Sequence, residues 1–145
     1  MNKQIKAIRL SGYGGLLPFI LTLAAFYFGP QASKAFFLDA FIAYSAVIFS
    51  FIGAVHWGFI FKAEPFDNAP RLLTLAVVPA LVAWVALLFP PLFALIVFAF
   101  AFPTLFVYER FSELGTLLPS WYMMLRVQLS LLVTIMQFIA IGGLL

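Results

Sequence analysis

Long apolar stretches, separated by short polar segments, are the main pattern along this chain. A membrane-spanning helix needs about 20 mostly apolar residues, and about 17 suffice where flanking side chains reach the interface. Five stretches approach this length, and we place them at residues 13–28, 40–61, 72–89, 92–108 and 125–145. The pattern predicts an all-α integral membrane bundle of about five transmembrane helices, which forms a single domain of residues 1–145.

Prolines divide and bend this apolar mass. Pro90 and Pro91 lie in a long apolar stretch that contains no charged residue to divide it. Proline removes a backbone donor and disfavours helix in the residue before it, so this pair predicts a tight turn between two short spans. Pro18, Pro79 and Pro103 lie inside predicted spans, and we expect helix kinks at these three positions.

The basic residues predict the orientation of the bundle. Those that fall on one side of the predicted spans are Lys3, Lys6, Arg9, Lys62, Arg71, Arg110 and Arg126, whereas Lys34 alone falls on the other side. Cytoplasmic segments carry an excess of lysine and arginine, so we expect the N-terminus inside and the C-terminus outside. The basic start followed by apolar residues also fits a secretory signal peptide. We interpret it as the first span.

The composition agrees with a membrane protein and excludes several other classes. Of the 145 residues, 66% are hydrophobic and 9% are charged, whereas roughly a quarter of a soluble domain is charged. The net charge of +3 is spread along the chain, so it indicates anchoring at the membrane surface and no nucleic-acid partner. The absence of cysteine excludes disulfides, thiolate metal sites and thiol catalysis.

Small residues recur every four positions in the second predicted span, at Ala46, Ser50, Ala54 and Gly58. Small residues at this spacing allow another helix to approach closely. We therefore expect this helix-packing face either at the centre of the bundle or at a dimer seam. Packing within the chain is the more common role of such a pattern.

His56 is the single histidine of the chain, and it lies six residues before Lys62. At 1.5 Å per residue this places it about 9 Å inside the helix end, at membrane depth. An ionisable group at that depth is a functional hypothesis by default. Histidine, cysteine and carboxylate partners at ligand spacing are missing from the sequence, so we expect no metal and no cofactor. Proton transfer, a hydrogen bond to a headgroup or quinone, and a structural hydrogen bond remain, the last being the most common.

The predicted topology gathers further polar and aromatic residues at the cytoplasmic level of His56. The residues of this predicted pocket are His56, Trp57, Arg71, Glu109, Trp121, Tyr122 and Arg126. Tyr122 and Arg126 are four residues apart and share one helical face. The pocket would receive an anionic headgroup or a partner protein. The alternative is an ordinary aromatic belt with arginines that reach the interface.

Several segments resemble an uncharacterised family of small membrane proteins, which includes transmembrane protein 69. The two most specific segments are Gly53-Ala54-Val55-His56-Trp57-Gly58 and Trp121-Tyr122 followed by Leu125-Arg126. The resemblance covers nearly the whole chain and implies a helix bundle without an established activity. The positions that match the family pattern are Pro18, His56, Trp57, Pro79, Trp84, Trp121, Tyr122 and Arg126.

Low charge, very short loops and the lack of a catalytic constellation favour a non-enzymatic accessory, assembly or scaffold protein. We expect its partners to be the lipid bilayer and either another membrane protein or a second copy of the chain. The alternative is a small binding or transport protein for a lipid, quinone or similar amphiphile, with its pocket around His56. A bacterial inner membrane is the expected location, with a mitochondrial inner membrane as the alternative.

Overall fold

The structure is a computed structural model in which residues 2–145 are described. Along the chain its elements are α1 (Lys3–Gly14), α2 (Leu17–Phe28), the 3-10 turn η1 (Gln31–Ser33), α3 (Lys34–Lys62), α4 (Ala69–Leu75), α5 (Val78–Leu87), α6 (Pro91–Phe111), α7 (Leu114–Leu117) and α8 (Ser120–Leu144). Among residues 2–145, five segments are long and apolar enough to cross a membrane. They are Lys3–Phe28, Gln31–Lys62, Ala69–Leu87, Pro91–Phe111 and Ser120–Leu144. The predicted all-α bundle of five membrane helices is confirmed.

The helices extend further than the predicted spans at the ends that carry basic residues. α1 begins ten residues before the predicted start of the first span and runs through Lys6 and Arg9, and α6 continues past the predicted end to include Arg110. A hydropathy criterion stops near the first charge, whereas a long basic side chain at a helix end can reach back to the interface. The helix itself need not end there.

Two of the three internal prolines stand where a helix starts again after a break. Pro18 lies in the first turn of α2 and Pro79 in the first turn of α5, where an N–H has no helical partner in any case. Next to the first break, the Tyr44 hydroxyl of α3 donates a hydrogen bond to the Gly15 carbonyl at 2.9 Å. Pro103 lies inside α6, which continues as a helix through it.

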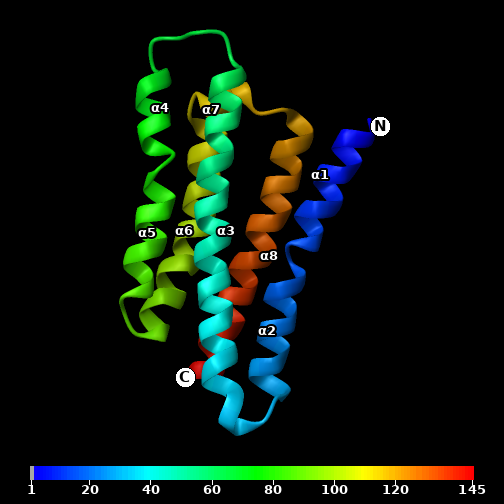
Figure 1. Cartoon of the computed structure of the whole chain (residues 1–145), viewed down its shortest axis with the longest axis vertical. Coiled ribbons are helices and arrows are strands. Elements are labelled where there is room, and N and C mark those ends of the chain that lie inside the picture. The colour runs from blue at the N-terminus through cyan, green and yellow to red at the C-terminus, as the bar shows by residue number, and fades with distance from the viewer. Residues whose placement is uncertain (1) are drawn as a thin grey trace.

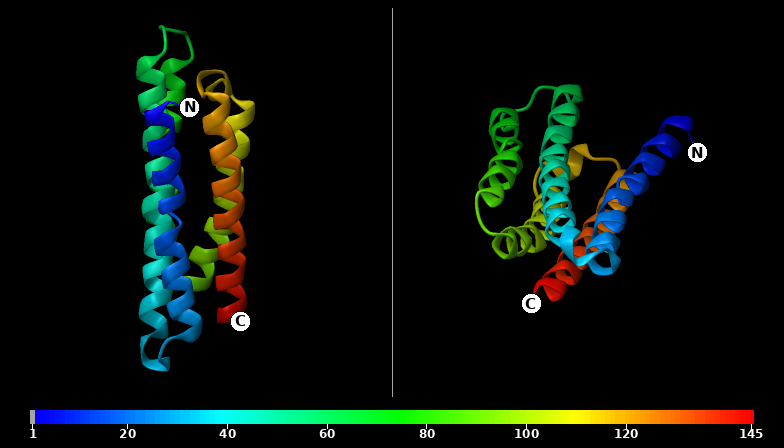
Figure 2. Two further views of the ribbon diagram at one scale, coloured as in Figure 1. Left: turned by 90° about the vertical axis from the view of Figure 1, so that its right-hand side faces the viewer. Right: turned by 60° about the horizontal axis from the view of Figure 1, so that its bottom comes forward.

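The chain ends lie at opposite ends of the bundle (Figure 1). The N-terminus, the α3–α4 loop and α7 lie at one end, which we call the N-terminal end, and the C-terminus lies at the other with the α2–α3 and α5–α6 connections. α3 packs between α2 and α5, while α6 packs against α8. In Figure 2 the α6 and α8 pair stands beside the layer that contains α2 and α3.

Aromatic rings fill the middle of the bundle. Phe19 and Phe41 meet edge to face with ring centroids 5.5 Å apart, and Phe49 meets Phe102 in the same way at 5.2 Å. Each of these four side chains is almost completely buried. Lipid tails are as apolar as these side chains, so close packing holds the spans together more than burial from water does.

A close approach between spans occurs at Gly53, which lies outside the predicted helix-packing face. A Cβ atom on Gly53 would lie 2.5 Å from the carbonyl oxygen of Ala76, at the break between α4 and α5. On the predicted face Ala46 is buried and Ser50 half-buried, whereas Ala54 and Gly58 are exposed. Within this chain that face is not one continuous seam, because the face that carries Gly53 points to α5.

Candidate functional site

Three ionisable side chains from three different spans meet inside the bundle. Nε2 of His56 on α3 lies 2.7 Å from Oε1 of Glu109 on α6. Nε of Arg126 on α8 donates to Oε2 of Glu109 at 2.9 Å and to Oε1 at 3.3 Å. The exposed fractions of His56 and Glu109 are 0% and that of Arg126 is 4%. We call this group the buried triad.

Local sequence explains the depth of the buried triad. Arg126 lies six residues after the start of α8, and His56 lies six residues before the end of α3. Each residue is therefore about 9 Å from the helix end along the axis. Glu109 lies near the end of α6, but the chain folds back tightly there: a Cβ on Gly115 would lie 2.6 Å from the Arg110 carbonyl oxygen. The turn therefore brings α7 over the end of α6.

An apolar cluster closes the N-terminal end above the buried triad. Its buried members, which we call the apolar cap, are Ile60, Leu72, Leu114, Leu118 and Tyr122. Ile60 lies one helical turn after His56, and Tyr122 lies one turn before Arg126, so each stands on the same helical face nearer the end. The apolar cap separates the buried triad from the loops.

Charge balance determines what the buried triad can do. Isolated charges are costly in an apolar interior, and the Arg126 guanidinium compensates the Glu109 carboxylate directly. With that carboxylate ionised, the contact to His56 requires a proton on Nε2, and in a neutral ring Nδ1 is then left as an acceptor. Chemically, the His56 and Glu109 pair can hold and exchange a proton while Arg126 keeps the carboxylate oriented.

The remaining residues of the predicted pocket differ in how deeply they are buried and in whether they lie near the buried triad. Tyr122 is buried beside it in the apolar cap, and its ring lies 5.2 Å from that of Phe59. Trp121 is half-buried. Trp57 is 40% exposed on the outside of α3, and Arg71 is exposed in α4. A headgroup outside the protein could touch Trp57 or Arg71 but not the buried triad.

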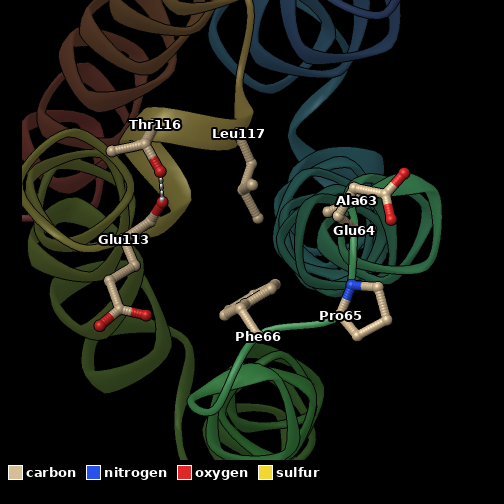
Figure 3. A pocket seen from close by; sticks show the side chains of 7 residues that line it. All are labelled: Ala63, Glu64, Pro65, Phe66, Glu113, Thr116 and Leu117. Atoms are coloured by element: carbon tan, nitrogen blue, oxygen red, sulfur yellow. Dashed lines mark hydrogen bonds between the residues drawn. The ribbon is translucent and has the colours of Figure 1, made fainter.

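A hollow of about 410 Å³ opens at the N-terminal end, but it does not contain the predicted pocket residues. Its lining consists of Ala63, Glu64, Pro65 and Phe66 of the α3–α4 loop and of Glu113, Thr116 and Leu117 around α7. Figure 3 shows Phe66 and Leu117 pointing into the hollow, while the carboxylates of Glu64 and Glu113 point away. His56, Glu109 and Arg126 instead contact one another in the core, and the pocket expected around them stays a prediction.

A second polar contact joins α3 to α8 deeper in the bundle. Nε2 of Gln137 donates to Oγ of Ser45 at 2.8 Å, and both side chains are fully buried. Ser45 precedes His56 by eleven residues, and Gln137 follows Arg126 by the same number, which returns each helix almost to the same face. Sequence reasoning did not select Ser45, although this eleven-residue spacing would have identified it.

Comparisons with known proteins place the chain among uncharacterised membrane proteins. A family model with the description "Protein of unknown function (DUF3429)" matches residues 4–142. Transmembrane protein 69 of Xenopus tropicalis is 40% identical over 88 residues, which are 54% of this chain and 31% of the relative. The chain thus spans less than a third of that relative's length. No solved structure matches the chain.

Proposed function

This chain belongs to the membrane-protein family described as protein of unknown function DUF3429, and we propose that it is a non-enzymatic accessory or assembly protein that docks with another membrane subunit. The docking face is the outer side of α3 at Ala54 and Gly58. The partner is an integral membrane protein that presents a helix with small residues of its own.

The observation that carries this proposal is the open surface at Gly58. A Cβ built on Gly58 meets no atom within 4 Å, and Ala54 one turn earlier is exposed as well. Both residues lie within the candidate span Gln31–Lys62. Since helices in lipid associate where small residues let backbones approach, this stretch of α3 suits a second helix.

The buried triad supports a structural role for the rest of the molecule. It ties α3, α6 and α8 together through one carboxylate. Neither His56 nor Glu109 is accessible from outside, which argues against a substrate that must contact these groups. The same burial argues against an amphiphile pocket around His56.

We also propose an orientation and a location for this subunit. Lys62, Arg71 and Arg110 lie near the N-terminal end of the bundle, together with the basic first turns of α1. An excess of basic residues favours the cytoplasmic side, so we propose that the N-terminal end faces the cytoplasm. A bacterial inner membrane fits this orientation, and a mitochondrial inner membrane is the alternative.

The docking face can be tested with a pair of glycine variants. Gly58→Leu fills the open surface of α3, while Gly142→Leu fills an equally open position near the end of α8, where a Cβ also meets nothing within 4 Å. Each protein is expressed with a tag in its native membrane, cross-linked there, and analysed by quantitative mass spectrometry. We expect Gly58→Leu to lower the yield of one specific membrane partner by roughly tenfold, because helix contact is lost.

Gly142→Leu should retain the partner at the wild-type level. If both variants retain it equally, or if the wild-type chain is cross-linked to no membrane protein, the docking proposal is wrong. Loss of a second copy of this chain, in place of a different protein, would instead identify α3 as the seam of a homo-oligomer.

A further inference from the structure

Two hydroxyl groups on α8 differ from the serine hydroxyls of α3 in how they are hydrogen-bonded. Ser45 and Ser50 on α3 each donate a hydrogen bond to the backbone carbonyl one turn earlier, at 2.9 and 2.8 Å, which is the usual way for a membrane helix to satisfy a hydroxyl. By contrast, the buried hydroxyls of Ser130 and Thr134 have no hydrogen-bond partner among residues 2–145. Their own helix does not satisfy them.

These hydroxyls belong to a row of polar groups on one face of α8, which we call the α8 row. Arg126, Ser130, Thr134 and Gln137 follow one another at helical spacing, and each has a buried polar atom without a partner in the described part of the chain. The unpartnered atoms are Nη2, Oγ, Oγ1 and Oε1, respectively. Arg126, Ser130 and Gln137 are at least 95% buried as whole residues. Buried polar groups in proteins are nearly always hydrogen-bonded, so this row requires partners that the chain does not supply.

The spacing of the row fits water. Arg126, Ser130 and Thr134 follow one another four residues apart, which is a rise of about 6 Å per step along the helix axis, and Gln137 follows three residues later, after about 4.5 Å. Two hydrogen bonds of about 2.8 Å placed end to end span nearly the distance of a four-residue step. One water between neighbours four residues apart can therefore bond to both groups, and such buried waters commonly bond two to four polar atoms.

We propose that the α8 row holds a file of water molecules inside the bundle and that this file gives protons access to the His56–Glu109 pair. Arg126 belongs to both the row and the buried triad, so the file begins beside the carboxylate that His56 contacts. The apolar cap blocks the shorter route by which water could reach the buried triad from the N-terminal end. The exchange replaces one ring proton by one solvent proton, so the triad keeps its charge.

The single histidine makes this proposal directly measurable. Protein labelled with ¹⁵N at histidine and reconstituted in liposomes gives solid-state NMR signals from one imidazole, that of His56. The first measurement is magnetisation transfer from water to this ring. The second is the rate at which the Nε2 proton is replaced after transfer into D₂O.

The test compares wild type with the double variant Ser130→Ala/Thr134→Val, which removes both hydroxyls and keeps the Gln137 contact to Ser45. We expect the variant to lose the water-to-ring transfer and to slow the exchange by roughly tenfold or more, because exchange then needs local opening. The matched control is Thr104→Val, since Thr104 is exposed on α6, and it should leave both measurements unchanged.

Two results would overturn the proposal. One is a wild-type ring that receives no magnetisation from water, which would mean that the row is dry. The other is a double variant with wild-type exchange and an unchanged imidazole spectrum, which would mean that protons reach His56 by another way. The unchanged spectrum also shows that the variant is folded, so the result can be interpreted.

Discussion

Glu109→Ala is expected to lower the free energy of unfolding by about 3–5 kcal/mol, because removing one partner of a buried ion pair leaves the other charge uncompensated. Here the stranded group is Arg126, which is 4% exposed and holds the carboxylate through Nε. His56 would lose its partner at the same time. The loss therefore affects contacts among three spans at once.

The measurement is SDS-induced unfolding in mixed micelles, followed by circular dichroism. Glu113→Ala is the matched control: Glu113 is exposed and its side chain accepts a hydrogen bond from Asn68, so the cost of this variant should stay below about 1 kcal/mol. The double variant Glu109→Leu/Arg126→Met should recover much of the loss, since it removes both charges. If the loss in the double variant equals the sum of the losses in the single variants Glu109→Leu and Arg126→Met, the two charges are not coupled.

Gly53→Ala is expected to destabilise the bundle by about 2–3 kcal/mol, because the added methyl group overfills a close contact. The new Cβ would lie 2.5 Å from the Ala76 carbonyl oxygen and 3.0 Å from Cγ of Pro79. The backbone oxygen cannot turn aside as a flexible side chain can. α3 and α5 must therefore move apart along their whole contact.

Gly58→Ala provides the comparison on the same helix. Gly58 has an open surface, and alanine favours a helix over glycine by up to about 1 kcal/mol. The same SDS titration should therefore find Gly58→Ala equal to or slightly more stable than wild type. Equal losses for the two variants would show that the cost at Gly53 comes from a general effect of the added methyl group, such as lipid contact, rather than from packing against α5.

The number and type of the spans could be predicted from the sequence because the membrane imposes a length and an apolar composition on each helix. The family resemblance, which rested on the segments around His56 and Arg126, is confirmed. Span ends were less predictable, since α1 continues through basic residues that a hydropathy pattern treats as a boundary.

The position of the site along the bundle follows from the predicted topology, but the contacts within the site do not. Placing His56, Glu109 and Arg126 near one end of the bundle required only the topology. Their mutual neutralisation depends on the rotation of three helices, which determines whether charges face one another or the outside. The same rotation decides between Gly53 and Ala54, adjacent residues of which one meets α5 and the other is exposed. A sequence pattern with several small residues does not specify that choice.

The break after α1 has a consequence for membranes of different thickness. The first span, Lys3–Phe28, has 26 residues and would measure about 39 Å as one straight helix, whereas the hydrocarbon core is about 30 Å thick. Because the helix stops and starts again next to Gly15, whose carbonyl accepts a hydrogen bond from Tyr44, α1 and α2 need not share one tilt. The first span can then fit a bilayer thinner than its full length while α1 keeps its contact with α8.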